Sequence, residues 1–222
     1  MLDQIESTNF SMVVIAPFAP SVFQPVWFAD QGLVGREAAV AATKDGSGFV
    51  LFEEAAKFTL GIFDITVQKD RMQVLTTRED GVQPMVDLFV ATMSLVEPLK
   101  ATALGFNFAV HFRTGSERGW HKAGDLLAGK DFWNAAWPKH VGLLNLQLAL
   151  SRIDDHPGQV NVHVQPSGLT QFGVFVNIND HFDFKDGKSG PEIASFASAE
   201  WQKSAYRSTA LIEKVVKESL RE

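Results

Sequence analysis

Four segments in the second half of the chain alternate large apolar residues with neutral amide or imidazole side chains. The segments span residues 106–112, 144–148, 160–165 and 174–179. Successive side chains of a β-strand point to opposite faces of its sheet, so each segment has one apolar face and one polar face. The fold of this chain therefore has to bury the apolar face of a sheet and to leave the polar face for solvent, a partner or a ligand.

The polar face of these segments is unusual because it is neutral. Its side chains are Asn107, His111, Asn145, Gln147, Asn161, His163, Gln165, Asn177 and Asn179. Amides and imidazoles supply hydrogen-bond donors and acceptors, and no Lys, Arg, Asp or Glu stands among them. We predict that these residues form a ligand-binding or interface surface.

The order of strand and helix patterns along the chain predicts an α+β fold. Strands are expected over residues 10–17, 58–68, 72–77, 101–113, 142–152, 159–165 and 171–182. Apolar residues at helical spacing predict helices over 84–97, 116–127 and 191–220, with a break near Ser198 left open. Residues 37–52 are ambiguous, and the turn at 44–48 favours a hairpin. Hairpin-linked strands with a few helices indicate a mostly antiparallel sheet that has helices packed on one face.

The apolar face of the sheet is expected to be buried under these helices. The residues assigned to it are Phe106, Phe108, Val110, Phe112, Leu144, Leu146, Val160, Val162, Val174, Val176 and Ile178. The last helix should bury a stripe of residues, namely Ile193, Ala197, Trp201, Ala205, Ile212, Val216 and Leu220. The chain has 18 Phe but only one Tyr, which suits a dry core because Phe carries no hydroxyl group.

The chain is expected to form a single domain over residues 1–222. No linker rich in Gly, Ser or Pro divides it. Each half, about 1–97 and 98–222, contains a meander and a helix, so an internal duplication is left open, although no repeat is visible at the residue level.

Composition argues against several classes of protein. The net charge of -6 and the pI near 5.5 argue against sequence-independent nucleic-acid binding, which needs clustered Lys and Arg. The absence of cysteine excludes disulfides, thiolate nucleophiles and Cys-ligated metals, and it fits a cytoplasmic protein. No apolar run is long enough to span a bilayer, and the acidic N-terminus does not resemble a signal peptide.

The motifs that suggest chemistry are better explained by local structure. Gly187-Lys188-Ser189 resembles the end of a phosphate-binding loop, but Phe182 stands where that loop needs its first glycine. His181 and Asp183 share one face of a strand and could contribute to a metal site, although a solvated strand end is favoured. We therefore expect no metal and no cofactor.

Two further groups of residues have a functional and a structural interpretation. The segment 154–158, with two Asp and one His, could supply a general base, but turns collect Asp for their own hydrogen bonds. Trp120, Trp133 and Trp137 could stack on a ligand, but aromatic residues at such spacing more often close a core. No catalytic residue is assigned.

The neutral face leaves three interpretations: a solvated surface, an interface with a like face, or the lining of a pocket for a small polar molecule. The leading hypothesis is a non-enzymatic, self-associating cytoplasmic interaction protein, a homodimer or other homo-oligomer without a nucleic-acid or membrane partner. The alternative is a small-molecule-binding protein or enzyme that uses the same face. In that case His111 or His163 titrates near neutral pH.

Overall fold

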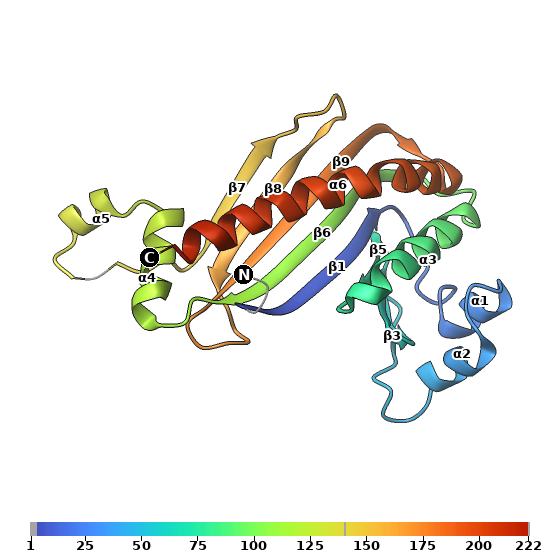
Figure 1. The fold of residues 1–222 in the computed structure, drawn as a ribbon. Helices are drawn as coiled ribbons and strands as arrows, with labels where there is room; N and C mark the ends of the chain where they lie inside the picture. Colours follow the sequence, from blue (N-terminus) through green and yellow to red (C-terminus); the bar gives the residue numbers. More distant parts are fainter. Residues whose placement is uncertain (1–3, 140, 222) are drawn as a thin grey trace.

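A computed structural model describes residues 4–139 and 141–221, in which a long sheet carries two long helices on one face (Figure 1). The strands are β1 (Ile5–Ile15), β2 (Val50–Leu51), β3 (Ala55–Leu60), β4 (Phe63–Gln68), β5 (Arg71–Thr76), β6 (Ala101–Arg113), β7 (Leu146–Ser151), β8 (Gly158–Pro166) and β9 (Gly173–Lys188). The α-helices are α1 (Pro25–Asp30), α2 (Arg36–Ala42), α3 (Val82–Ser94), α4 (Glu117–Leu127), α5 (Asp131–Ala136) and α6 (Gly190–Ser219).

The nine strands form one antiparallel sheet in the order β2-β3-β4-β5-β1-β6-β9-β8-β7. The two long strands β1 and β6 lie side by side in its centre. The predicted α+β class and the largely antiparallel sheet are confirmed. Within the described residues, no helix is both long and apolar enough to cross a bilayer.

The core lies between the sheet and the two long helices, α3 and α6, which pack against each other (Figure 1). Phe106 and Phe108 of β6 contact the Trp201 ring of α6, with ring centroids 5.3 and 5.1 Å apart. Burying a Phe side chain stabilises the fold by about 2–3 kcal/mol. The apolar stripe predicted for the last helix therefore holds it against the sheet, although Ala205 and Leu220 are only half-buried.

Local sequence fixes where α6 begins and how closely it approaches α3. Ser189 and Glu192 form a capping box, and Pro191 occupies the first turn. A Cβ atom at Gly190 would lie 2.2 Å from the Val96 carbonyl oxygen, so only glycine fits at this approach. The helix then continues without a break at Ser198.

Three predictions about local structure are wrong. Residues 58–68 are not a single strand, because β3 ends at Leu60 and β4 begins at Phe63, and the two strands pair with each other. Residues 37–52 do not form a hairpin: α2 occupies residues 36–42, and only Val50–Leu51 pairs as a strand. The alanine-rich sequence favours helix because alanine has the highest helix propensity. Leu144 is not buried but 83% exposed, because β7 begins only at Leu146. Leu146 and Val160, which the sequence also predicts to be buried, are only half-buried.

The two halves of the chain have the same order of elements. Each begins with a long strand, continues through two short helices and a meander, and ends with a long helix, α3 or α6. A common origin of the halves stays a prediction, as does the single-domain organisation.

Candidate functional site

Eight of the nine predicted site residues lie on one face of the sheet. The cross-strand pairs place Asn107 opposite Asn179, which lies opposite Asn161, and they place Asn177 opposite His163. Paired residues of antiparallel strands point to the same face. The residues of this surface, hereafter the amide face, are Asn107, His111, Gln147, Asn161, His163, Gln165, Asn177 and Asn179.

The amide face is opposite to the face that α6 covers. Phe106 and Phe108, which flank Asn107 in β6, pack on Trp201 of α6, so Asn107 points away from the helix. Asn145 does not belong to this surface, because it precedes β7 in an irregular, exposed stretch. The alternation in the sequence thus assigns eight residues to a common face and fails at the end of a strand, while their role as a binding or interface surface stays a prediction.

A row of hydrogen bonds joins the amides of three strands. Gln159 Nε2 donates to Asn161 Oδ1 (2.7 Å), Asn161 Nδ2 donates to Asn179 Oδ1 (3.1 Å), and Asn179 Nδ2 donates to Asn107 Oδ1 (2.9 Å). Gly105 makes room for this row, since a Cβ atom there would lie 2.7 Å from Asn179 Nδ2. These hydrogen bonds hold the side chains of the row in fixed orientations. They do not involve Asn107 Nδ2, which can therefore donate to a ligand.

A cluster of rings lies beside this row of amides. The Phe175 ring lies between two imidazoles, with centroid distances of 4.7 Å to His111 and 5.8 Å to His163. His111 Nδ1 lies 2.8 Å from Ser167 Oγ. Burial lowers the pKa of His111 from its ordinary value of 6.5, because the charged imidazolium would lose its solvent. The imidazole is therefore neutral at pH 7.

Two polar groups at the centre of the amide face lack a protein partner among the described residues. His163 Nε2 is buried and accepts or donates no hydrogen bond. Asn177 lies between His163 and Ala109 in the sheet, and none of the side-chain hydrogen bonds of the described residues involves it. Buried polar groups in proteins nearly always have partners. Asn177 is only half-buried, so its amide can bind a ligand directly, whereas the enclosed His163 Nε2 can do so only if neighbouring side chains move.

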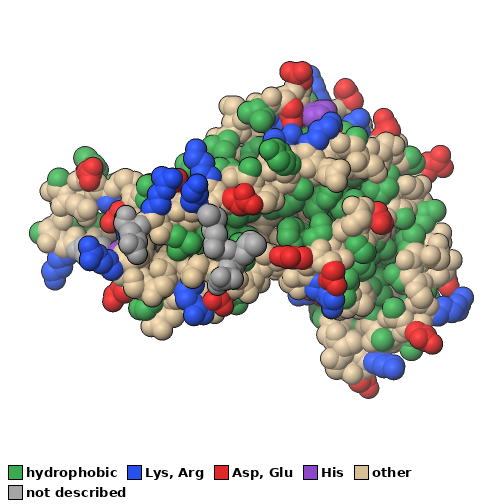
Figure 2. All heavy atoms as spheres, in the orientation of Figure 1, with side chains coloured by type: hydrophobic (Ala, Val, Ile, Leu, Met, Phe, Trp, Pro, Cys, Tyr) green, Lys and Arg blue, Asp and Glu red, His purple; other side chains and the backbone are tan. Residues whose placement is uncertain are grey.

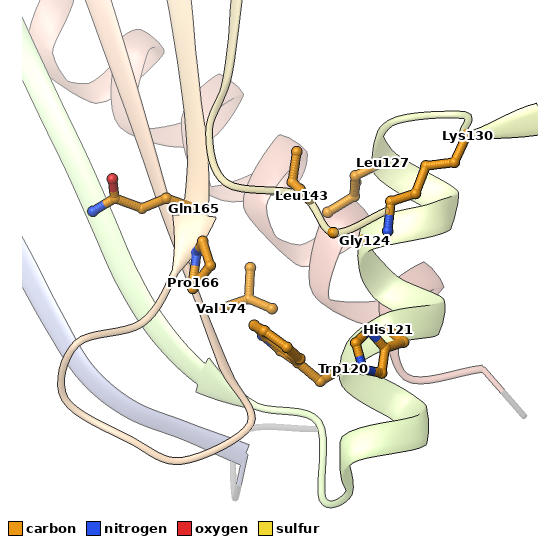
Figure 3. Close-up of a pocket in the computed structure, with 10 residues that line it drawn as sticks. Trp120, His121, Gly124, Leu127, Lys130, Leu143, Gln165, Pro166 and Val174 are labelled. Atoms are coloured by element: carbon orange, nitrogen blue, oxygen red, sulfur yellow. The ribbon is translucent and has the colours of Figure 1, made fainter. Parts of the chain in front are cut away.

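The structure also places the other groups considered from the sequence. His181 Nε2 lies 3.1 Å from Asp183 Oδ1, but the described residues contain no cluster of three or more candidate metal ligands. Trp120 Nε1 donates to the Gly173 carbonyl oxygen (3.1 Å) and borders a cavity of about 30 Å³ between α4 and the sheet (Figure 3). That space holds roughly one water molecule, and Trp120 packs as expected, whereas Trp133 and Trp137 are exposed.

The opposite side of the same strands carries a cluster of charges that the sequence analysis missed. It consists of Arg152, Asp154, Asp180 and Arg207, hereafter the ionic cluster. Arg152 forms a two-pronged pair with Asp154, at 2.7 Å for each contact, and also donates to Asp180. Arg207 Nη2 donates to Asp180 Oδ2 (2.8 Å), and Arg207 Nη1 lies 3.2 Å from Asp154 Oδ2.

The ionic cluster is largely shielded from solvent. The side chains of Asp180 and Arg152 are only 1% and 3% exposed. The hydrogen bonds from Arg152 lower the pKa of Asp154 to about 2. The sequence feature that could have predicted this cluster is Asp180, which lies between Ile178 and Phe182 on the apolar face of β9. A carboxylate at such a position requires a buried cation.

Comparison with known proteins gives little guidance. No family model and no curated protein matches the sequence. Among solved structures the chain is similar to a rolling circle replication initiator protein from Geobacillus stearothermophilus. The TM-score is 0.30 and the identity 9%, over 87% of this chain and 78% of that one. This neighbour conflicts with the prediction of a non-enzymatic, self-associating protein without a nucleic-acid partner, and that prediction is withdrawn. A likeness this slight assigns no activity to the chain.

Proposed function

We propose that the protein binds a small, uncharged, planar molecule on its amide face. The molecule carries both hydrogen-bond donors and acceptors, as a nucleobase or nucleoside does. The observation that carries the proposal is the neutral row of amides next to the half-buried Asn177, whose side chain makes no hydrogen bond with the described residues. The proposal includes a cytoplasmic location, which the absence of cysteine supports.

The charge of the surface selects against ionic ligands. The eight residues of the amide face carry no formal charge, and burial keeps His111 neutral at pH 7. A charged group that left water for this surface would find no countercharge among them, and such a transfer is costly. Phosphate binding needs Lys or Arg side chains or a helix N-terminus. The face therefore favours a base or nucleoside over its phosphorylated form.

The side chains also suit the edges of a planar heterocycle. Asn and Gln amides form paired hydrogen bonds with nucleobase edges, because an amide presents a donor and an acceptor side by side. The half-buried ring of Phe175 lies next to these amides. Aromatic rings stabilise a stacked base by about 1–3 kcal/mol. We assign the recognition of the ligand edge to Asn177 and the contact with its ring to Phe175.

The test is a nuclear magnetic resonance titration of ¹⁵N-labelled protein with adenosine, guanosine, cytidine and uridine, and with their monophosphates. We expect at least one nucleoside to shift the side-chain amide signals of Asn177 and Asn179. Replacing Asn177 by leucine should weaken binding about tenfold, as the loss of a hydrogen-bonding group does.

The matched control is Asn134→Leu, which makes the same substitution at an exposed position of α5. It should leave binding unchanged. The proposal fails if no nucleoside shifts these signals, or if Asn177→Leu and Asn134→Leu bind equally well. It also fails if the monophosphates bind more tightly than the nucleosides, because that result places a cationic site elsewhere.

A further inference from the structure

A cleft of about 320 Å³ lies between α6 and the β7–β8 hairpin, on the side of the sheet opposite to the amide face. Its walls are mainly apolar side chains from both the strands and the helix. They include Leu150, Val160, Ile178, Tyr206, Ala210 and Leu211. Clefts of this size and composition are typical of small-molecule sites.

The cleft exists because α6 leaves the last strand of the sheet uncovered. The helix packs on β6 and β9, and Figure 1 shows β7 and β8 extending beyond it. Leu148 of β7 is therefore 45% exposed, and Ile153 and Tyr206 at the cleft are 88% and 80% exposed. Figure 2 shows hydrophobic side chains at the surface alongside α6. A surface of this kind gains stability when an apolar molecule covers it.

One end of the cleft is formed by the ionic cluster, whose two arginines differ in what they can still bind. Arg152 is 3% exposed, pairs with both aspartates, and stacks over the Phe182 ring at 3.8 Å. Arg207 is 21% exposed, and its contacts with the aspartates involve only Nη1 and Nη2. A guanidinium carries five N–H groups, so Arg207 keeps donors for a ligand.

We infer that this cleft binds a small, mainly apolar molecule that has a single oxygen acceptor, a carboxylate or a hydroxyl group, directed at Arg207. The apolar body covers Ile178 and Leu211, and the oxygen accepts a hydrogen bond from the guanidinium. A ligand with an ammonium group in the same place is rejected, because Arg207 offers only N–H donors there and both carboxylates of the cluster are already paired with the two arginines. This site is separate from the amide face and does not depend on its ligand.

The test uses three probes with the same alkyl chain: octanoate, octanol and octylamine. Binding is followed through the methyl signals of Ile178 and Leu211. Octanoate and octanol should shift these signals, and octylamine should bind about tenfold more weakly or not at all. Equal binding of all three probes would overturn the role of Arg207, and binding of none would overturn the site.

A pair of variants locates the binding in the cleft. Ala210 is exposed and lines the cleft, so Ala210→Trp should block it without disturbing the core. Thr209 is the adjacent exposed residue and does not line the cleft, so Thr209→Trp is the matched control. Octanoate affinity should fall at least about tenfold in the first variant only. Equal affinities in the two variants would contradict the inference, provided that circular dichroism shows both to be folded.

Discussion

Replacing Arg152 by methionine tests how much the fold depends on the ionic cluster. The substitution keeps an apolar stem above the Phe182 ring and removes the guanidinium. It leaves the carboxylate of Asp180, which is 1% exposed, with Arg207 as its remaining partner. Removing one member of a buried ion pair costs about 3–5 kcal/mol, because the other charge stays buried. Since Arg207 still pairs with Asp180, we expect the lower end of that range, about 3 kcal/mol.

The measurement is urea unfolding at pH 7, in which the midpoint should fall while the slope stays constant. Arg71→Met is the matched control, because Arg71 pairs with Asp70 at the surface, where the two side chains are 47% and 63% exposed. Exposed pairs contribute little to stability, so the control midpoint should barely move. The double variant Arg152→Met/Asp180→Asn should be more stable than Arg152→Met alone, since it removes the excess negative charge of two carboxylates that share only Arg207.

Acid unfolding gives an independent readout of the same cluster. The pKa of Asp154 is lowered from 3.8 to about 2 in the folded protein, chiefly by its hydrogen bonds with Arg152. The stabilisation that results is present above pH 3.8 and is lost as the pH falls toward about 2. Arg152→Met should remove this contribution. A loss below about 1 kcal/mol at pH 7, or an unchanged acid transition, would refute the buried cluster.

Three further outcomes are expected. Because burial lowers the pKa of His111 below 6.5, the unfolded chain binds the proton more readily, so stability should fall as the pH drops below that value. His111→Gln should flatten this part of the pH profile in thermal denaturation. Trp201→Ala should cost about 3–5 kcal/mol in urea unfolding, because the ring fills the core against Phe106. Gly105→Ala should displace the Asn179 amide and shift its ¹⁵N signal, whereas an unmoved signal would contradict the close approach.

The sequence predicts the two faces of the sheet well, because their cause is local. Strand alternation has a period of two, and it requires only that the segment be a strand. Asn177 and Ile178 are therefore assigned to opposite faces without knowledge of any neighbour. The same argument fails for Leu144, which has the right residue type but lies before the strand begins. Periodicity cannot locate the end of a strand, because the end depends on which residues find a pairing partner.

Long-range contacts could not be predicted in the same way. Arg207 and Asp180 come together only because α6 folds back across β9. Residues 36–42 are apolar and alanine-rich, which is compatible with either helix or strand, so their helical state depends on local propensity and packing together. Only Asp180 could have been noticed in the sequence, because it is a carboxylate at an apolar position of its strand. No sequence spacing indicates that Arg207 is its partner.

The two proposed sites lie on opposite sides of the same strands, and this arrangement makes them separable. Asn177 and Ile178 are neighbours in β9, yet one belongs to the amide face and the other lines the cleft. A single layer of backbone separates the two surfaces. Substitutions at independent sites have additive effects on the free energy, whereas substitutions at coupled sites do not. If the sheet is rigid, Asn177→Leu should weaken the nucleoside and leave octanoate unaffected, and Ala210→Trp should do the reverse. Should each substitution weaken both ligands, the strands must shift as a unit, and the two surfaces form a single coupled site.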